Sequence, residues 1–461
     1  MSGIGKIVII GCGAGGGTAA QFARKTDRQA EITIFEKEKY SQYSKCGLPY
    51  TISGKIPKFS DLIEFSEDWF KKNHIDIFLE TIVDKIDLKS KIIIARRGMK
   101  NHEKKFDRLI IATGATPSIP PIQNLKKNGD LIKGVHALRT IDDGERISLS
   151  IKKGKRATII GAGLIGLEMA DSLHQRGMEV TVVEALPSIL ANTIDNDMCE
   201  SILKELNKKI NLFTNHTATR VEEHDGKIKK VFIKDNETGK EKQVDADLLI
   251  IAAGIKPNVQ LAKSIGCTIG KTGGIVVNEK SETSVKNVYA VGDCTEYMDF
   301  VTKKYVRMGL GSIAVRQGIA AGINAAGGNY KLPMGFLLTR TSEFFGIEVA
   351  AVGPVEDSCQ NIPIVHGKFK GSSLPDYFPG GKSVDMKVGV HEKTGKIIYA
   401  QAVGSNAAQR INVFACAILN EANVEDFKKL ETAYAPPIAP TLDALTLVCD
   451  VVSLKLARKK R

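Results

Sequence analysis

The chain alternates short runs of β-branched residues with longer stretches in which apolar positions recur at helical spacing. This alternation is typical of α/β proteins, in which crossover helices cover the faces of parallel sheets. From about residue 331 the pattern changes to alternating strands with two helical patches. The sequence therefore predicts an α/β chain with a C-terminal region of different character.

One arrangement of elements occurs twice. In the first copy an apolar strand over residues 7–10 enters a glycine-rich turn at 11–16, and a helix and a second strand follow, ending at Glu36. In the second copy the turn is 161–166 and the second strand ends at Glu184. Strand, glycine turn, helix, strand and acid follow in the same order, which predicts two Rossmann-like units.

Each turn has the pattern Gly-x-Gly-x-x-Gly and opens a helix. Such a turn lets the backbone approach a pyrophosphate, and the free N–H groups of the helix N-terminus hold the anion. An acid about 20 residues later accepts hydrogen bonds from a ribose. Two copies predict two dinucleotides, most economically FAD and a nicotinamide nucleotide. The expected contacts are Gly11, Gly13, Gly16 and Glu36 in one copy, and Gly161, Gly163, Gly166 and Glu184 in the other.

A buried strand that enters a glycine turn follows each copy, within residues 106–117 and 247–258. A further strand over 287–291 ends at Asp293, whose carboxylate could bind a ribitol hydroxyl of a flavin. This carboxylate assigns FAD to the first copy. The like charge of Glu184 disfavours a 2′-phosphate, so NADH is expected over NADPH. Five further residues are expected cofactor contacts: Lys45, Cys46, Thr113, Gly114 and Gly254.

These changes in pattern place domain boundaries near residues 117, 256 and 330. They divide the chain into the first part of an FAD-binding domain (1–117), an NAD(P)-binding domain (118–256), the second part of the FAD-binding domain (257–330) and a C-terminal domain (331–461).

Composition narrows the class of protein. Hydrophobic residues make up 43% and charged residues 25% of the 461 residues, which is ordinary for a globular protein. There is no long apolar run, no early signal-peptide pattern and no Cys-x-x-Cys pair among the eight cysteines. We therefore expect a cytoplasmic protein without a metal site, and exclude a secreted disulfide scaffold and a membrane protein.

The formal net charge is +13, and five of the positive charges stand in the last seven residues. A basic tail can bind nucleic acid or an acidic membrane surface, but most such tails are solvated ends. We expect neither partner here.

Cys46 is the candidate redox centre. It stands in Tyr-Ser-Lys-Cys-Gly-Leu-Pro-Tyr at residues 43–50, just after the second strand of the first copy. A chain that returns over the flavin at this point could place the sulfur beside the isoalloxazine. Lys45 and a helix N-terminus after Pro49 could both favour the thiolate. The other seven cysteines are expected to pack as apolar residues.

Taken together, these motifs resemble the flavin-dependent pyridine nucleotide–disulfide oxidoreductases over essentially the whole chain. Because one cysteine stands at the redox position, the chain resembles the single-cysteine branch of that family. This branch contains coenzyme A disulfide reductases, NADH oxidases and persulfide or polysulfide reductases. The glutathione reductase branch has a second cysteine about five residues away and a C-terminal His-Pro, whereas the last histidine here is His391. Cys-Gly-Leu-Pro-Tyr at 46–50 is similar to the coenzyme A disulfide and persulfide reductase signature.

The resemblance implies specific roles. Residues 331–461 would form an α+β dimerisation domain, and the loop Tyr-Ala-Pro-Pro at 434–437 would approach the cysteine of a second subunit in a homodimer. Cys46 would cycle between a thiol and a mixed disulfide or persulfide. Tyr434 and Tyr377 could donate the proton to the leaving thiolate, and Glu168 would sit where the nicotinamide meets the flavin.

Coenzyme A would lie along the first helix, with Thr18, Arg24 and Lys25 available for its phosphates. Three positions depart from the family pattern. Gln42 replaces a usual serine, Lys45 a small polar residue, and Leu442 a basic residue. The expected substrate contacts are Thr18, Arg24, Lys25 and Gln42.

The leading prediction is an FAD-dependent enzyme that uses NADH, with NADPH as the alternative, to reduce a small-molecule disulfide, persulfide or polysulfide through Cys46. An oxidase that reduces oxygen through a sulfenic acid at Cys46 is an alternative. A flavoprotein that passes electrons to a small acidic redox protein is another.

Overall fold

The computed structural model describes residues 5–459, which form two compact units. The first unit contains the chain up to Ser118 together with Arg139–Gly144 and Gly254–Phe336. The second contains Ile119–Leu138, Glu145–Ala253 and the chain from Leu337 onward. The two predicted parts of the FAD-binding domain fall in the first unit. The predicted NAD(P)-binding and C-terminal domains fall together in the second, each with its own sheet.

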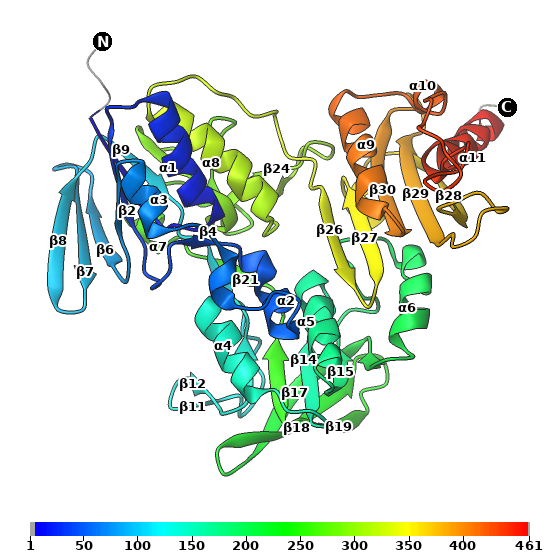
Figure 1. Cartoon of the computed structure of the whole chain (residues 1–461), viewed down its shortest axis with the longest axis horizontal. Coiled ribbons are helices and arrows are strands. Elements are labelled where there is room, and N and C mark those ends of the chain that lie inside the picture. The colour runs from blue at the N-terminus through cyan, green and yellow to red at the C-terminus, as the bar shows by residue number, and fades with distance from the viewer. Residues whose placement is uncertain (1–4, 460–461) are drawn as a thin grey trace. The chain divides into compact units, whose positions relative to one another are not determined.

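The first unit is built on a five-stranded parallel sheet of strand order β23-β9-β1-β2-β5 (Figure 1). The central strand β1 is buried, and its register pairs Ile10 with Phe35 of β2 and with Ile111 of β9. The strands are β1 (Lys6–Ile10), β2 (Glu31–Phe35), β5 (Ile75–Phe78), β9 (Arg108–Ile111) and β23 (Val288–Ala290).

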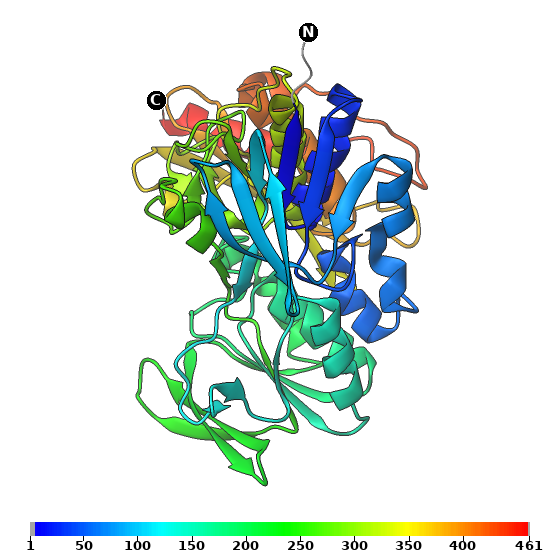
Figure 2. The same cartoon turned by 90° about the vertical axis from the view of Figure 1, so that its left-hand side faces the viewer.

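Two different layers cover this sheet. On one face, Ile7 and Ile9 of β1 pack against helices α1 (Ala14–Thr26) and α8 (Gly311–Ala325). On the other face, Val8 of β1 packs against a three-stranded antiparallel meander, which crosses in front of the sheet in Figure 2. Alternate residues of one strand thus serve two cores. The meander strands are β6 (Ile82–Asp87), β7 (Ile92–Arg97) and β8 (Lys100–Lys105).

Helices α1 and α8 lie side by side although they are far apart in the sequence (Figure 1). Gly318 and Gly322 of α8 make the close approach possible. A Cβ atom on Gly318 would lie 2.5 Å from the carbonyl oxygen of Gly15, and one on Gly322 would lie 2.3 Å from that of Ala19. Larger residues at either position would push the two helices apart.

The two similar segments downstream of the glycine motifs pair with each other. Strands β10 (Ala115–Pro117) and β21 (Ile255–Pro257) form an antiparallel ribbon in the first unit.

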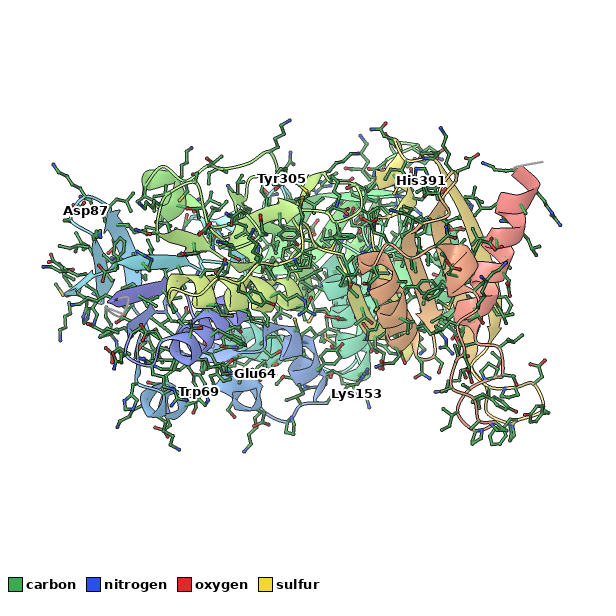
Figure 3. All side chains as sticks on the ribbon, turned by 90° about the horizontal axis from the view of Figure 1, so that it is seen from above. Glu64, Trp69, Asp87, Lys153, Tyr305 and His391 are labelled. Carbon is green, nitrogen blue, oxygen red and sulfur yellow. The ribbon has the colours of Figure 1, made fainter. Side chains whose placement is uncertain are left out.

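Near the edge of the parallel sheet, the chain's single tryptophan, Trp69, stacks on Phe65 with ring centroids 4.1 Å apart (Figure 3). They belong to α3 (Glu67–Lys72) and β4 (Ile63–Phe65).

The second unit repeats the design of the first. Its parallel sheet has the strand order β13-β20-β14-β15-β16, in which β14 takes the central place that β1 has in the first sheet. An antiparallel sheet of β17, β18 and β19 packs on it through a shared apolar core. These elements are β13 (Val135–Ala137), β14 (Arg156–Ile160), α5 (Leu164–Gln175), β15 (Glu179–Val183), β16 (Asn211–Phe213), β17 (His216–His224), β18 (Lys227–Asp235), β19 (Glu241–Asp245) and β20 (Leu248–Ile251).

The C-terminal part of this unit is a five-stranded antiparallel sheet of order β26-β27-β30-β29-β28, against which α9 and α11 pack. Together, the two parallel sheets and this sheet confirm the predicted fold class. In the described part of the chain, no helix has the length and apolar character needed to span a bilayer. The elements are β26 (Arg340–Phe344), β27 (Ile347–Val352), β28 (Ile364–Ser372), β29 (Ser383–His391), β30 (Ile397–Gly404), α9 (Ala407–Leu419) and α11 (Ala444–Lys459).

A buried lysine of the C-terminal sheet binds carboxylates from two turns of the second unit. Lys387 of β29 is only 2% exposed, and its Nζ lies 2.8 Å from Asp195, 3.0 Å from Asp197 and 2.7 Å from Glu356. Burial alone would lower the pKa of Lys387, but the hydrogen bonds and charges of the three carboxylates raise it above the usual value. The lysine is therefore a buried cation that fixes the turn at residues 195–197 to the C-terminal sheet.

Replacing this lysine should destabilise the protein strongly. Lys387→Met leaves three carboxylates without their central cation, which should cost about 3–5 kcal/mol and lower the thermal midpoint by about 10 °C. Lys370→Met is the matched control, because Lys370 is 71% exposed and lies 3.7 Å from Asp385. Differential scanning calorimetry measures both variants, and equal midpoints would contradict a role for the buried cluster.

Candidate active site

The first glycine turn has the geometry that its sequence pattern predicts. Gly11 has a φ of +101°, and a Cβ atom there would lie 2.3 Å from the carbonyl oxygen of Ala112. A Cβ atom on Gly16 would lie 2.0 Å from the carbonyl oxygen of Gly11, so α1 starts as close to the turn as two backbones allow. No atom lies within 4 Å of the Cβ position of Gly13. The turn is therefore packed on two sides and open on the third.

The second turn repeats this geometry closely. Gly161 has a φ of +107°, with its Cβ position 2.5 Å from the carbonyl oxygen of Ala252. The Cβ position of Gly166 lies 2.0 Å from the carbonyl oxygen of Gly161, and that of Gly163 is open. Both open glycines leave room for a bulky anion at the N-terminus of a helix.

Glu36 closes the first turn from the end of β2. Its Oε2 accepts a hydrogen bond from the backbone N–H of Cys12 at 2.6 Å, and its Oε1 accepts one from that of Glu38 at 2.9 Å. Burial raises the pKa of Glu36, and these two hydrogen bonds act against the rise. The carboxylate is held beside the turn, where a ribose hydroxyl could reach it.

Glu184 has the same arrangement in the second copy. Its Oε2 accepts from the backbone N–H of Ala162 at 2.6 Å, and its Oε1 from that of Leu186 at 2.9 Å. Its negative charge is held where the sequence predicts the adenine ribose of a nicotinamide nucleotide. This placement is consistent with the expected preference for NADH, which stays a prediction.

Asp293 lies at the start of the segment that leads toward α8. Its Oδ2 accepts a hydrogen bond from Arg139 at 2.6 Å, and the Cβ position of Gly309 lies 3.6 Å from its Oδ1. Sequence reasoning did not identify Arg139, because 154 residues separate it from Asp293 and no motif surrounds it. The arginine gives the first unit a positive charge beside this carboxylate.

Thr113 and Gly114 are bonded to the second similar segment. The hydroxyl of Thr113 donates to the carbonyl of Asn258 at 2.6 Å, and the side-chain amide of Asn258 donates back to the carbonyl of Thr113 at 2.9 Å. The backbone N–H of Asn258 also donates to the carbonyl of Gly114 at 2.9 Å. Gly254 accepts from Ser118 at 2.9 Å and has a φ of +93°. These residues fix the ribbon of β10 and β21, and their contact with a cofactor stays a prediction.

Cys46 lies in a short 3₁₀ turn (Lys45–Gly47) that continues into helix α2 (Leu48–Ser53). The side chain is exposed, and the Cβ position of Gly311 lies 3.9 Å from its Sγ atom. Gly311 is the first residue of α8, so the sulfur lies at the positive end of a long helix. Such a position favours the thiolate.

The expectation that Lys45 favours this thiolate stays a prediction, and the structure shows that the lysine also binds an acid. The Nζ of Lys45 lies 2.7 Å from Oε1 of Glu38 and 3.0 Å from the hydroxyl of Tyr43. The hydroxyl of Tyr43 donates to the other oxygen of Glu38 at 2.5 Å, and burial with the charge of Glu38 raises the pKa of Tyr43. Glu38 thus balances the charge of Lys45. The sequence analysis did not identify Glu38 or the hydroxyl of Tyr43 as partners of this lysine.

The remaining thiols differ from Cys46. Six cysteines are buried, and Cys416 is the other exposed one. Burial raises the pKa of Cys199 to about 11 and that of Cys449 to about 12, so both remain thiols at neutral pH. The six buried residues are Cys12, Cys199, Cys267, Cys294, Cys359 and Cys449.

The structure brings together the two tyrosines that the sequence nominates as proton donors. The hydroxyls of Tyr377 and Tyr434 are 2.8 Å apart, although 57 residues separate them. Both side chains are exposed, and the hydrogen bond with Tyr434 is the main cause that raises the pKa of Tyr377. A pair of exposed, hydrogen-bonded hydroxyls can supply a proton to an approaching group.

Glu168 lies on α5, two residues after the second glycine turn. Burial raises the pKa of its carboxyl, and the hydroxyl of Ser342 donates to its Oε1 at 2.5 Å. Ser342 is another residue that the sequence analysis missed. The predicted position of Glu168 beside a nicotinamide stays a prediction.

The four expected substrate residues are not gathered into one exposed site. Thr18 and Gln42 are 6% and 7% exposed. The guanidinium of Arg24 donates to backbone carbonyls, including those of Asn73 at 3.0 Å and His74 at 2.7 Å. The exposed Lys25, with its Nζ 4.6 Å from the ring centroid of Phe22, is better placed to bind a phosphate.

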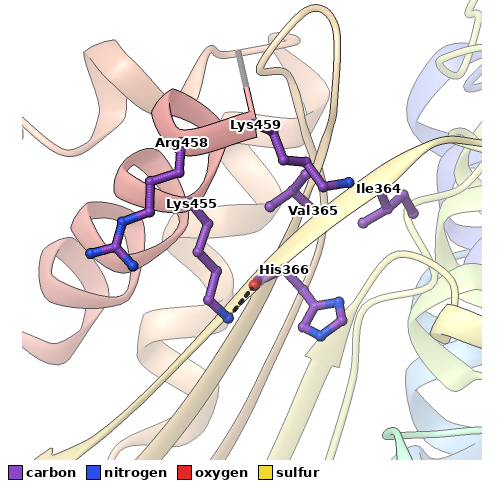
Figure 4. A pocket seen from close by; sticks show the side chains of 6 residues that line it. All are labelled: Ile364, Val365, His366, Lys455, Arg458 and Lys459. Carbon is purple, nitrogen blue, oxygen red and sulfur yellow. Dashed lines mark hydrogen bonds between the residues drawn. The ribbon is translucent and has the colours of Figure 1, made fainter. Parts of the chain in front are cut away.

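A hollow of about 340 Å³ lies between β28 and the end of α11 (Figure 4). The described part of the basic tail lines it, and the side chain of Lys455 donates to the carbonyl of His366 at 3.0 Å. Lys459 pairs with Glu392 at 3.1 Å, and residues 460–461 of the tail lie outside the described residues. The hollow contains none of the predicted site residues. Its lining consists of Ile364, Val365, His366, Lys455, Arg458 and Lys459.

Comparison with protein families gives two matches. The model described as pyridine nucleotide-disulphide oxidoreductase matches residues 5–318. The model of the dimerisation domain of the same proteins matches residues 340–445.

Individual relatives cover nearly the whole chain. An NADH oxidase of Methanocaldococcus jannaschii is 38% identical, over 98% of this chain and 100% of its own. A CoA-dependent NAD(P)H sulfur oxidoreductase of Pyrococcus furiosus is 32% identical, over 97% of this chain and 99% of its own. The solved structure of an NAD-dependent persulfide reductase from A. fulgidus superposes with a TM-score of 0.92 at 32% identity, covering 98% of this chain and 84% of that one.

The two open glycines provide a reciprocal test of the nucleotide assignment. Gly163→Ala should weaken the binding of NAD⁺ by about tenfold while the flavin content stays unchanged, because the added Cβ atom enters the space left for a pyrophosphate. Gly13→Ala should instead lower the flavin content and leave the affinity for NAD⁺ in the flavin-loaded fraction unchanged. Calorimetric titration and the flavin absorbance of the purified proteins measure both effects. Loss of the same nucleotide in both variants would refute the assignment.

Proposed function

The chain belongs to the pyridine nucleotide–disulphide oxidoreductases, and we propose that it uses NADH to reduce a disulfide, persulfide or polysulfide at Cys46. The protein is an FAD-dependent NAD(P)H oxidoreductase. One observation carries the sulfur chemistry: Cys46 is an exposed thiol whose sulfur faces the first residue of α8. The buried thiols have no comparable access to an acceptor.

The residues of both glycine turns fit the two cofactors. In the first unit Gly13 leaves open space at the start of α1, and Glu36 and Asp293 would hold the FAD ribose and ribitol hydroxyls. In the second unit Gly163 leaves the equivalent space, and Glu184 would hold the ribose of NADH. When bound, FAD carries two electrons from NADH toward the sulfur centre.

The reaction that we assign to Cys46 is an exchange at sulfur. The thiolate attacks one sulfur of the acceptor, forms a mixed disulfide or persulfide, and releases the other sulfur as a thiolate that takes up a proton. Two electrons then break the new S–S bond, so that Cys46 returns to the thiolate and the second sulfur leaves as a thiolate or hydrosulfide that takes up a proton. The positive end of α8 stabilises the sulfur anion at both stages.

The leaving thiolate needs a proton donor, and we assign this role to Tyr434 with Tyr377. Their hydroxyls form a pair 2.8 Å apart on the exposed side of the dimerisation domain. In the homodimer that this domain suggests, the pair of one subunit would act at Cys46 of the partner subunit. The geometry supports the pair as one proton-donating unit.

The acceptor class follows from the relatives and from α1. A CoA-dependent sulfur oxidoreductase is among the relatives, and Lys25 offers an exposed cation on α1 for a phosphate-bearing acceptor. A second candidate reaction is the reduction of oxygen with a sulfenic acid at Cys46, which the relative named NADH oxidase favours.

The first prediction concerns the thiol. Cys46→Ser should reduce anaerobic NADH oxidation with CoA disulfide and with polysulfide by at least ~100-fold, because serine does not carry the exchange at sulfur. Cys416→Ser, which removes the other exposed thiol, should keep wild-type turnover. Both variants should still allow NADH to reduce the flavin.

Spectrophotometric assays of NADH with each acceptor, under argon and in air, separate the candidate reactions. Turnover only in air would favour the oxidase. Flavin reduction without consumption of any acceptor would refute the reaction at Cys46 and direct attention to a protein acceptor.

The second prediction concerns the tyrosine pair. Tyr434→Phe and Tyr377→Phe should each slow turnover of the sulfur acceptor by about 10–100-fold, because the proton donor is lost or loses its hydrogen-bonded partner. Stopped-flow reduction of the flavin by NADH should be unchanged. Tyr305→Phe, at an exposed tyrosine of the first unit, is the matched control (Figure 3). Wild-type turnover in both variants of the pair would contradict the assignment.

A further inference from the structure

A serine of the C-terminal sheet reaches the helix of the second glycine turn. The hydroxyl of Ser342 on β26 donates to Oε1 of Glu168 on α5 at 2.5 Å, across 174 residues of sequence. Ser342 is 8% exposed, and alternation along β26 turns its side chain to the same face as Arg340 and Phe344. The hydrogen bond therefore joins the C-terminal sheet to helix α5 of the same unit.

The structure fixes β26 on both sides of this serine. Arg340, two residues before it, donates to the carbonyls of Leu338 and Gly353 at 2.7 and 2.8 Å and to that of Thr193 at 2.7 Å. On the other side of the serine, Phe345 directly follows the end of β26. The centroid of its ring lies 5.6 Å from that of His174 on α5. Anchors on both sides hold the hydroxyl at one distance from α5.

Few other groups act on the carboxyl of Glu168. Burial raises its pKa, and the hydrogen bond from Ser342 is the influence that lowers it. Arg340 is bonded to backbone carbonyls, and Arg156 of β14 pairs with Asp245 at 2.5 Å. The titratable groups on α5 and the strands packed against it are Asp171, His174, Arg156, Glu179, Arg340 and Glu343.

We propose that Ser342 is a positioning residue for Glu168. The hydroxyl of Ser342 holds the carboxylate of Glu168 in one orientation and stabilises its ionised form. The C-terminal sheet would thereby set the state of a group on the nucleotide-binding helix. The inference rests on the proposed function for the place of Glu168 beside the nicotinamide. The hydrogen bond itself does not depend on any role of Cys46.

The direction of the effect follows from the charge. A donor to a carboxylate favours the charged form and lowers the pKa of the acid. In Ser342→Ala the partly buried carboxyl keeps its desolvation but loses the donor, so the pKa of Glu168 should rise further. The acid would then protonate at higher pH, and the change in its environment should weaken the binding of a nicotinamide ring at that pH.

Four variants test this inference: Ser342→Ala, Ser342→Thr, Thr341→Ala and Glu168→Gln. Infrared difference spectroscopy follows the carbonyl stretch of the protonated acid, which Glu168→Gln assigns. Ser342→Ala should move the titration upward by about one pH unit, which is a tenfold change in the protonation equilibrium. Ser342→Thr keeps the hydroxyl and should titrate as wild type does.

Thr341→Ala is the matched control on the same strand. It removes a hydroxyl that donates to the carbonyl of Val349 at 2.9 Å, on the exposed side of β26, and should leave the titration in place. The second readout is the binding of a non-reducing tetrahydronicotinamide analogue of NADH across pH. The pH at which binding weakens should shift with the titration in Ser342→Ala.

An unchanged titration in Ser342→Ala, or an equal shift in Thr341→Ala, would overturn the inference. So would analogue binding that does not respond to Glu168→Gln. These measurements can be repeated with Cys46→Ser, in which the sulfur chemistry is absent. Failure of the reaction proposed for Cys46 is therefore distinguishable from failure of this inference.

Discussion

In each nucleotide-binding half, one helix starts as close to the preceding turn as two backbones can approach. The Cβ positions of Gly16 and Gly166 lie 2.0 Å from the carbonyl oxygens of Gly11 and Gly161, so any larger residue must displace the helix. In the first unit this approach fixes the start of α1, and α8 packs on α1 through Gly318. The first residue of α8 in turn faces the sulfur of Cys46. The position of the Cys46 thiol thus depends on the glycine turn through a chain of close backbone contacts.

The surroundings of Cys46 include groups that are far from it in the sequence. Lys45 is adjacent along the chain, but its charge is matched by Glu38 and its ammonium group also contacts Tyr43. The first residue of α8 lies beside the sulfur, and a helix N-terminus carries a positive partial charge. This partial charge belongs to backbone groups, which cannot swing away as a side chain can.

Local spacing was sufficient to predict the geometry of the glycine turns and the place of both acids beside them, because each depends on residues close in sequence. It did not predict the ion pair of Lys45 with Glu38, and the roles of Lys45 and Cys46 stay predictions. It missed the bonds of Asp293 with Arg139 and of Glu168 with Ser342, which span 154 and 174 residues and carry no motif. Such contacts are set by the packing of whole sheets, which a single sequence does not reveal.

The burial of six thiols has a consequence for damage by oxidants. Oxidation of cysteine beyond the sulfenic acid is irreversible for most proteins and begins at exposed thiolates. Because the buried sulfurs are shielded, peroxide would reach the exposed Cys46 and Cys416 long before it reached the core. Oxidative ageing of this protein would therefore produce intact, folded molecules that retain both nucleotides and lack only their sulfur chemistry.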